Sequence, residues 1–278
     1  MTGAWWVEQA RDVVAIGGDD AESYLQGQIS QDVSALAPGD STWSLVLSPQ
    51  GKVEAWFRLH AMADGTYVAD LDAGFSPQLI ARLERFRLRV DVRFEPLSWR
   101  FGVLRGESVE PPAAPEGGLV VAVDWPGFEG YDVLGPTVQL PGGVEVVDAL
   151  HYERARVGAG WPVMGAEFTE KTIPAEAGIV ERSVSFTKGC FTGQELVARI
   201  DSRGNNTPRR LCRLVGVHDQ LVEVGDTVTF DGKDVGVVSS AVAGDGARPA
   251  VALAYLHRSV ALPAEVVVPS GTMAVVAP

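Results

Sequence analysis

The residues with the clearest potential for chemistry lie between positions 188 and 199, in the sequence KGCFTGQELVAR. Cys190 is one of two cysteines in the chain, and it follows Lys188 and Gly189 directly. Glycine lets the backbone turn sharply and approach a ligand closely, and cationic neighbours favour the nucleophilic thiolate form of a cysteine. The pattern therefore predicts a reactive or ligand-binding thiol at Cys190. The alternative is a cysteine that packs in the core as a small apolar residue.

Three polar side chains follow this cysteine, at Gln194, Glu195 and Arg199. Their spacing prevents all three from sharing one face of a helix, whereas Glu195 and Arg199 are four residues apart. Two interpretations remain open: these side chains bind a ligand, or Glu195 and Arg199 form an ion pair on a helix surface. The second cysteine, Cys212, lies in an apolar stretch, and we expect it to be structural.

The composition restricts the class of partner. A chain of 278 residues with 46% hydrophobic residues is long enough for two or three compact units. Its net charge of −13 disfavours nucleic acid and anionic membranes as partners. The N-terminal residues lack the pattern of a secretory signal, no stretch is apolar enough to span a bilayer, and two cysteines do not indicate a disulfide framework. The four histidines show no metal-ligand spacing. We therefore expect a cytoplasmic protein that binds neither metal, nucleic acid nor membrane.

The elements that must position these residues change in type along the chain. Apolar runs bounded by turns predict strands at 13–16, 43–47 and 53–62. The spacing of apolar residues predicts a helix over 76–87, with a proline in its first turn. After Pro208, short β-rich segments alternate with Gly–Asp turns, which is typical of a small β-barrel. The sequence alone thus indicates an α+β region followed by a barrel.

Five segments resemble the YgfZ family of folate-binding proteins, which are related to the aminomethyltransferase (T-protein) of the glycine cleavage system. The strongest is KGCFTGQE followed by arginine, at 188–199. The others are YLQGQISQDV at 24–33, PQGKV at 49–53, RVGAGWP at 156–162 and EKTIP at 170–174. The resemblance therefore covers nearly the whole chain.

The resemblance implies an α+β, aminomethyltransferase (GcvT)-like fold, with two interleaved α+β domains and a C-terminal β-barrel around a central channel. On this basis we expect domain 1 to comprise residues 1–45 and 108–207. Domain 2, an antiparallel sheet with helices, would comprise 46–107, and the barrel 208–278.

The resemblance also implies a ligand, which is tetrahydrofolate or a one-carbon derivative. Gln194 and Glu195 could match the amide and amino edge of the pterin with hydrogen bonds, and Arg199 could bind the carboxylates of the folate tail. Lys188 could add a positive charge to the same site. A basic patch of Arg203, Arg209 and Arg210 is a second candidate for the anionic tail, or a solvated loop.

Two carboxylates of the aminomethyltransferases are missing when this chain is compared with them. Ala55 stands at the position of their catalytic aspartate, after the turn at 49–52, and Gly158 stands at a second carboxylate position. Neither residue can transfer a proton. Glu54 is a poor substitute for the aspartate, because neighbouring residues of a strand point to opposite faces. Whether the chain is an enzyme stays open, but we do not expect a conventional aminomethyltransferase.

The resulting prediction is a folate-binding protein that supports iron–sulfur cluster assembly or repair, with iron–sulfur client or assembly proteins as partners and Cys190 near the mouth of the folate channel. The thiol could contact folate, a client protein or a cluster intermediate. Two alternatives are a folate-dependent one-carbon transferase or demethylase, and a scaffold that has lost its ligand. The folate species, the clients and the oligomeric state are beyond the sequence.

Overall fold

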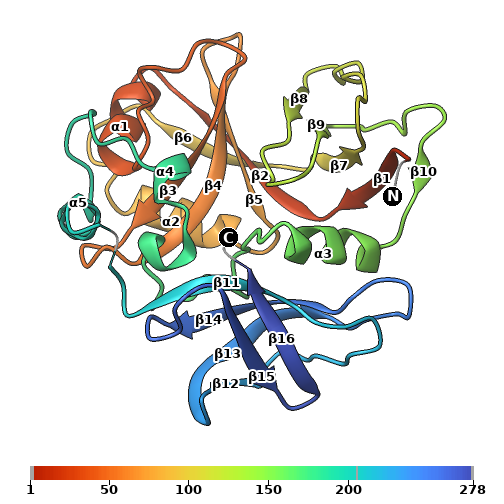
Figure 1. Ribbon diagram of the computed structural model, residues 1–278. Coiled ribbons are helices and arrows are strands. Elements are labelled where there is room, and N and C mark those ends of the chain that lie inside the picture. The colour runs from red at the N-terminus through yellow and green to blue at the C-terminus, as the bar shows by residue number, and fades with distance from the viewer. Residues whose placement is uncertain (1–2, 205, 277–278) are drawn as a thin grey trace.

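The computed structural model describes residues 3–204 and 206–276, which form two open sheets and a closed barrel (Figure 1). The first sheet has the strand order β10-β1-β7-β9-β8. All its neighbouring strands are antiparallel except β1 and β10. Its strands are β1 (Trp5–Gln9), β7 (Arg100–Arg105), β8 (Leu119–Ala122), β9 (Gly130–Gly135) and β10 (Glu145–Val146).

The second sheet is fully antiparallel, with the order β3-β4-β5-β2-β6. Helices α1 (Ala21–Gln28) and α2 (Ser76–Glu84) cover one of its faces, where Leu25, Leu79 and Leu83 pack into one apolar core with the strands. Helix α2 ends three residues before the predicted helix. The strands are β2 (Arg11–Gly17), β3 (Ser41–Leu47), β4 (Val53–Ala61), β5 (Tyr67–Asp72) and β6 (Arg93–Leu97).

The C-terminal strands close into a six-stranded barrel in the order β11-β14-β13-β12-β15-β16, which confirms the barrel predicted from the short β-rich segments. Cys212 lies in its core and is fully buried. The strands are β11 (Arg209–Val215), β12 (Thr227–Phe230), β13 (Lys233–Val242), β14 (Val251–His257), β15 (Ala264–Val268) and β16 (Gly271–Val276).

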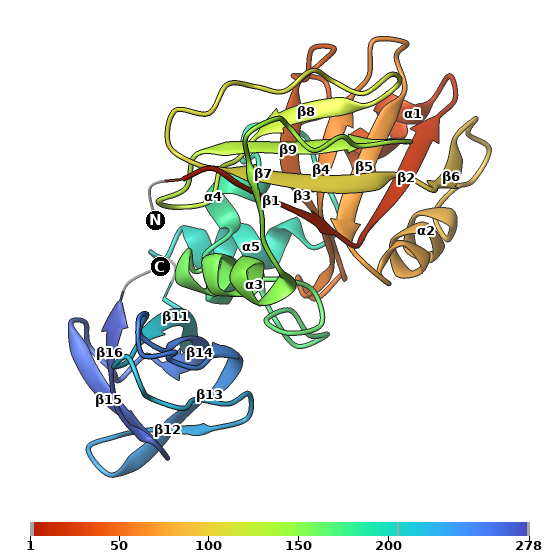
Figure 2. The same ribbon diagram turned by 90° about the vertical axis from the view of Figure 1, so that its right-hand side faces the viewer.

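Helix α3 (Ala149–Gly158) lies between the barrel and the two sheets (Figures 1 and 2). It packs against β1 on one side and against β13 and β14 on the other. Three short elements follow it in the chain: the 3-10 helix η1 (Pro174–Ala177), α4 (Val180–Ser183) and α5 (Gln194–Asp201).

The strand pairing bears on how the chain divides into units. Strands β1 and β2 are separated by a single residue, Ala10, yet they belong to different sheets. Strands β2 and β3 pair with strands of residues 46–107, and β7 pairs with β1 and β9. The sheets are therefore interleaved in sequence, while the domain limits at 45/46 and 107/108 stay a prediction.

A buried chain of charged side chains joins the two open sheets. Asp70 on β5 accepts hydrogen bonds from Arg11 (2.7 Å) and Arg58 (3.0 Å). Arg58 on β4 also pairs with Asp132 on β9 at 2.9 Å, and Asp132 pairs with Arg105 on β7 at 2.8 Å. Burial alone would raise the pKa of Asp70, but the guanidinium groups of Arg58 and Arg11 hold that pKa well below its ordinary value. Charge pairing therefore links the packing of one sheet to that of the other.

Aromatic rings fill the remaining space between the open sheets. Trp43 stacks on Trp56 with ring centroids 4.3 Å apart, and Trp161 contacts both rings at 5.3 Å. Trp125 stacks on Trp161 at 5.7 Å. The space left among these rings and the buried arginines is only about 20 Å³, so the interior of this region is closed to any molecule larger than a water.

Candidate functional site

Segments that are far apart in the sequence meet around the predicted thiol. The turn at 49–52 packs against the beginning of α5, where a Cβ on Gly51 would lie 2.9 Å from the side chain of Leu196. Gly193 approaches the same turn, because a Cβ there would lie 2.6 Å from the carbonyl oxygen of Ser48. Both glycines have positive φ, 68° and 82°, which glycine adopts at little cost. Close backbone approach thus explains glycine at both positions.

Lys188 ties the same loop to the segment that follows α1. Its amino group donates hydrogen bonds to the carbonyl oxygens of Ile29 and Gln31, both at 2.8 Å. The residue is 8% exposed, and burial lowers the pKa of its ammonium group to about 8. The side chain of Lys188 therefore binds the backbone of the segment that follows α1.

A second lysine connects the turn at 49–52 to the segment at 170–174. Lys52 donates through its amino group to the carbonyl oxygen of Lys171 at 2.8 Å. The backbone N–H of Val53 donates to the carbonyl oxygen of Thr172 at 2.9 Å. Four of the five segments that carry the family resemblance thus contact one another around the loop at 188–193.

Cys190 is exposed in this loop, immediately before α5, whereas Cys212 is buried in the barrel. Exposure is a requirement for a thiol that reacts with, or binds to, another molecule. The structure thus disfavours the alternative of a core-packed cysteine for Cys190. Its functional role stays a prediction.

The polar residues of α5 have contacts of their own. Glu195 and Arg199 form an ion pair at 2.8 Å, with side chains that are 89% and 53% exposed. Gln194 accepts a hydrogen bond from the backbone N–H of Phe191 at 3.3 Å. Of the two interpretations left open by the sequence, the structure shows the ion pair on a helix surface.

Ala55, at the position of the aminomethyltransferase aspartate, lies in the apolar core under α1 and α2 and is 2% exposed. Its neighbour Trp56 points to the other face of the sheet, into the aromatic cluster. Glu54 pairs with Arg82 on α2 at 2.6 Å. No acid therefore reaches the space between the sheets from these three positions.

A cavity of about 400 Å³ lies where all three sheets meet, and we call it the junction cavity. Its walls are the β1–β2 connection, the end of β5, one face of α3, residues 163–166 and the C-terminal part of β13. Among the residues that the structure describes, its lining includes none of Lys188, Cys190, Gln194, Glu195 and Arg199. The predicted thiol and this cavity are two separate places on the molecule.

Charged side chains line the junction cavity from the side of the open sheets. Asp72 pairs with Arg11 at 2.8 Å and accepts a hydrogen bond from the backbone N–H of Met164 at 2.8 Å. Burial raises the pKa of Asp72, although Arg11 opposes this effect. Tyr152 on α3 lies beside them, and burial raises its pKa to about 12. A carboxylate and an aromatic ring thus share one wall of the cavity.

The barrel side of the junction cavity is fixed by Glu167, which is fully buried. It accepts hydrogen bonds from the hydroxyl groups of Ser239 and Ser240, both at 2.7 Å, and pairs with Arg156 at 3.2 Å. Arg156 belongs to the RVGAGWP segment, so the family resemblance could have indicated it. Nothing in the sequence distinguishes Arg11, Asp72 or Glu167 from surface charges, because their partners come from other elements.

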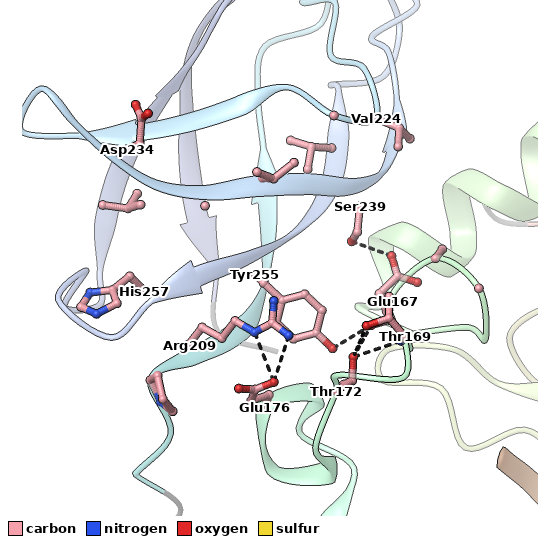
Figure 3. A pocket seen from close by; sticks show the side chains of 18 residues that line it. Glu167, Thr169, Thr172, Glu176, Arg209, Val224, Asp234, Ser239, Tyr255 and His257 are labelled. Atoms are coloured by element: carbon pink, nitrogen blue, oxygen red, sulfur yellow. Dashed lines mark hydrogen bonds and ion pairs between the residues drawn. The ribbon is translucent and has the colours of Figure 1, made fainter. Parts of the chain in front are cut away.

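The junction cavity adjoins an open groove of about 800 Å³ between the barrel and residues 165–176, and both are lined by Ala166, Val224 and Ser239. In Figure 3, Arg209 lies over the ring of Tyr255 and faces Glu176. The Arg209 side chain is 39% exposed. Of the predicted basic patch, Arg209 is the member that lines this groove.

Within residues 3–204 and 206–276, no group of three or more His, Cys, Asp or Glu side chains is arranged to hold a metal ion. The same residues contain no helix long and apolar enough to cross a membrane.

The fold has a close counterpart among solved structures. The structure superposes on the glycine cleavage system aminomethyltransferase T of Bartonella henselae with a TM-score of 0.82, over 100% of this chain and 86% of that chain, at 19% sequence identity. The predicted α+β fold with a C-terminal barrel is thereby confirmed. No family model matches the sequence.

Three curated proteins are similar to this chain, each at 28% identity. An uncharacterized protein of Haemophilus influenzae aligns over 84% of this chain and 82% of its own length. The tRNA-modifying protein YgfZ of Escherichia coli aligns over 77% of this chain and 72% of its own length. A mitochondrial iron–sulfur cluster assembly factor IBA57 homolog of Mycosarcoma maydis aligns over 70% of this chain and 53% of its own length. Together with the fold, these similarities confirm the predicted resemblance to the YgfZ family.

Proposed function

We propose that this protein supports the assembly or repair of iron–sulfur clusters in client enzymes, with Cys190 as the group that contacts a client or a cluster intermediate. The observation that carries the proposal is the exposed thiol on a loop that several distant segments hold in place. The similarity to a cluster assembly factor and to YgfZ supports it. A free exposed thiol also suits a reducing compartment such as the cytoplasm.

The residues around Cys190 then have a positioning role. Lys188 fixes the loop to the backbone after α1, and the side chain of Gln194 holds the turn that leads into α5. Glu195 and Arg199 stabilise the exposed face of that helix. In this proposal none of the four binds folate, because none lines the junction cavity.

The clients we propose are proteins. The E. coli relative is named for tRNA modification, but a net charge of −13 disfavours direct binding of an RNA backbone by this chain. A client enzyme that modifies tRNA and itself carries an iron–sulfur cluster would be compatible with both facts.

We propose the junction cavity as the folate site. Its volume of about 400 Å³ lies within the usual range for small-ligand pockets, roughly 300–1,000 Å³. Asp72 could pair with the amide and amino edge of the pterin, Tyr152 could pack against its ring, and Arg209 in the adjoining groove could bind a tail carboxylate. A bound tetrahydrofolate would supply the capacity to carry a one-carbon unit.

Obstructing the junction cavity should prevent folate binding. Ala73 is exposed at its edge, and Ala73→Trp is expected to weaken tetrahydrofolate binding at least about tenfold, since an indole occupies much of the available volume. Isothermal titration calorimetry measures this. Ala81→Trp, on the exposed face of α2 and outside the cavity, is the matched control. Equal binding by Ala73→Trp and the wild type would place the folate elsewhere.

The proposed function is tested by genetic complementation. In cells that lack the native gene, the activity of a [4Fe–4S] dehydratase is expected to recover when the wild-type chain is supplied. The same enzyme should stay at its reduced activity with an empty vector. Failure of the wild-type chain, when it is expressed at the native level, would refute the proposed function.

A further inference from the structure

A pocket of about 430 Å³ lies where η1 meets the beginning of the barrel, and we call it the η1 pocket. Its walls come from η1 and Gly178, from the residues that precede β11, from the beginning of β11 and from Arg258, directly after β14. Among the described residues, it shares Glu176 with the open groove and no residue with the junction cavity. Its volume lies within the usual range for small-ligand pockets, roughly 300–1,000 Å³.

Two arginines line the η1 pocket, and neither forms an ion pair with a carboxylate of the described residues. Arg210 donates through Nη2 to the carbonyl oxygen of Val260, while its Nη1 is accessible and has no partner in the described part of the chain. Arg258 is exposed, and its guanidinium makes one long hydrogen bond, 3.4 Å from Nη1 to Oδ1 of Asn206. Both arginines therefore keep donors with which to bind a ligand.

The backbone fixes the points from which these two side chains reach the pocket. Strand β11 pairs with β14, with Arg210 opposite Leu256. The backbone N–H of Arg258 donates to the carbonyl oxygen of Pro208 at 2.9 Å. The hydroxyl group of Thr207, which also lines the pocket, donates to the carbonyl oxygen of Arg209 at 2.6 Å. Two neighbouring barrel strands thus present their guanidinium groups to one pocket.

The charges around the η1 pocket are positive on balance. The two arginines line it together with one carboxylate, that of Glu176. Arg209 pairs with this carboxylate at 3.2 Å, and Figure 3 shows the two groups facing each other. Asp201 and Arg203, which precede the lining residues in the chain, have opposite charges and leave the balance unchanged. Two positive charges remain in a chain whose net charge is −13, and a concave site of this kind attracts anions.

We propose that the η1 pocket binds a small molecule with a doubly negative, oxygen-rich group, which is a phosphate monoester or a dicarboxylate. Its oxygens would accept hydrogen bonds from the guanidinium groups of Arg210 and Arg258, whose paired donors match the geometry of phosphate and carboxylate. The two negative charges would balance the two positive charges of the pocket. This site is independent of Cys190 and of the proposed folate site.

Glycerol 2-phosphate and succinate are the probes that test this site, because they carry the two kinds of doubly negative group on small bodies. Titration calorimetry of the full chain at pH 8 keeps the phosphate ester doubly charged, since its second pKa is about 6. A salt concentration of about 50 mM limits the screening of exposed charges. Arg258→Gln removes one guanidinium at an exposed position. Arg85→Gln, at an exposed arginine that forms no ion pair among the described residues and lies outside the pocket, is the matched control.

At least one probe is expected to bind the wild type, and Arg258→Gln should weaken that binding about tenfold or more. Arg85→Gln should bind like the wild type, and both variants should melt at the wild-type temperature. Tighter binding of glycerol 2-phosphate would assign a phosphate ester to the pocket, and tighter binding of succinate a dicarboxylate. Absence of binding by both probes at about 10 mM, a level that detects even weak complexes, would overturn the proposal. Equal weakening by Arg85→Gln, or undiminished binding by Arg258→Gln, would do the same.

Discussion

Replacing Arg58 with methionine is expected to lower the free energy of unfolding by about 3–5 kcal/mol, because it leaves two buried carboxylates short of a partner. The side chain of Arg58 is 4% exposed and pairs with Asp70 at 3.0 Å and with Asp132 at 2.9 Å. It also lies over the ring of Trp43 at 5.5 Å. Methionine preserves most of the volume, so the loss reports chiefly on charge pairing.

Urea denaturation at pH 7, followed by tryptophan fluorescence, measures this loss. The matched control is Arg93→Met, whose arginine is 72% exposed and pairs with Asp91 on the surface; its effect should stay within about 0.5 kcal/mol. A loss below about 1 kcal/mol for Arg58→Met would show that the buried pairs contribute little.

The pH dependence of the same two proteins gives a second readout. The folded state lowers the pKa values of Asp70 and Asp132. A carboxyl group with a lowered folded pKa stabilises the fold above its unfolded value of about 3.9, and this stabilisation is lost as the pH falls through the folded pKa. The difference between wild type and Arg58→Met should therefore be largest near neutral pH and shrink in acid.

The fold could be predicted to a large extent from local patterns. The barrel strands are short, bounded by Gly–Asp turns and complete within 70 residues, so each signal is local. The helix predicted over 76–87 begins at the predicted residue, Ser76, but α2 ends at Glu84. Phe86, which lies within the predicted helix but beyond the end of α2, is 42% exposed. Helical spacing thus extended the prediction beyond the residues that the second sheet covers.

The residues of the candidate sites were harder to predict, because tertiary packing decides which charges meet. Glu195 and Arg199 have the types expected of a folate site, yet they pair on a helix surface. Arg11 and Asp72 are ordinary in the sequence, but pairing between β2 and β5 places them together at the junction cavity. The passage of the chain from one sheet to the other at Ala10 likewise follows from tertiary packing. Spacing along one element gave no signal for these contacts.

Cys190→Ala is expected to remove the function of the protein in cells while leaving its fold intact. The thiol is exposed, so its loss creates no cavity in the core. The hydrogen bonds of Lys188 and the close packing at Gly51 and Gly193 do not involve the cysteine side chain. The variant should therefore have wild-type stability. Cys212→Ala, which removes the other thiol from the barrel core, is the matched control and should retain function.

The role of the Cys190 thiol is tested most directly by the specific activity of a [4Fe–4S] dehydratase in cells lacking the native gene, compared at equal levels of the supplied protein. Wild type is expected to give near-normal activity and Cys190→Ser the activity of the empty vector, and Cys190→Ala should behave like Cys190→Ser. Full recovery of dehydratase activity with Cys190→Ala would contradict the assignment of the thiol as the group through which this protein acts.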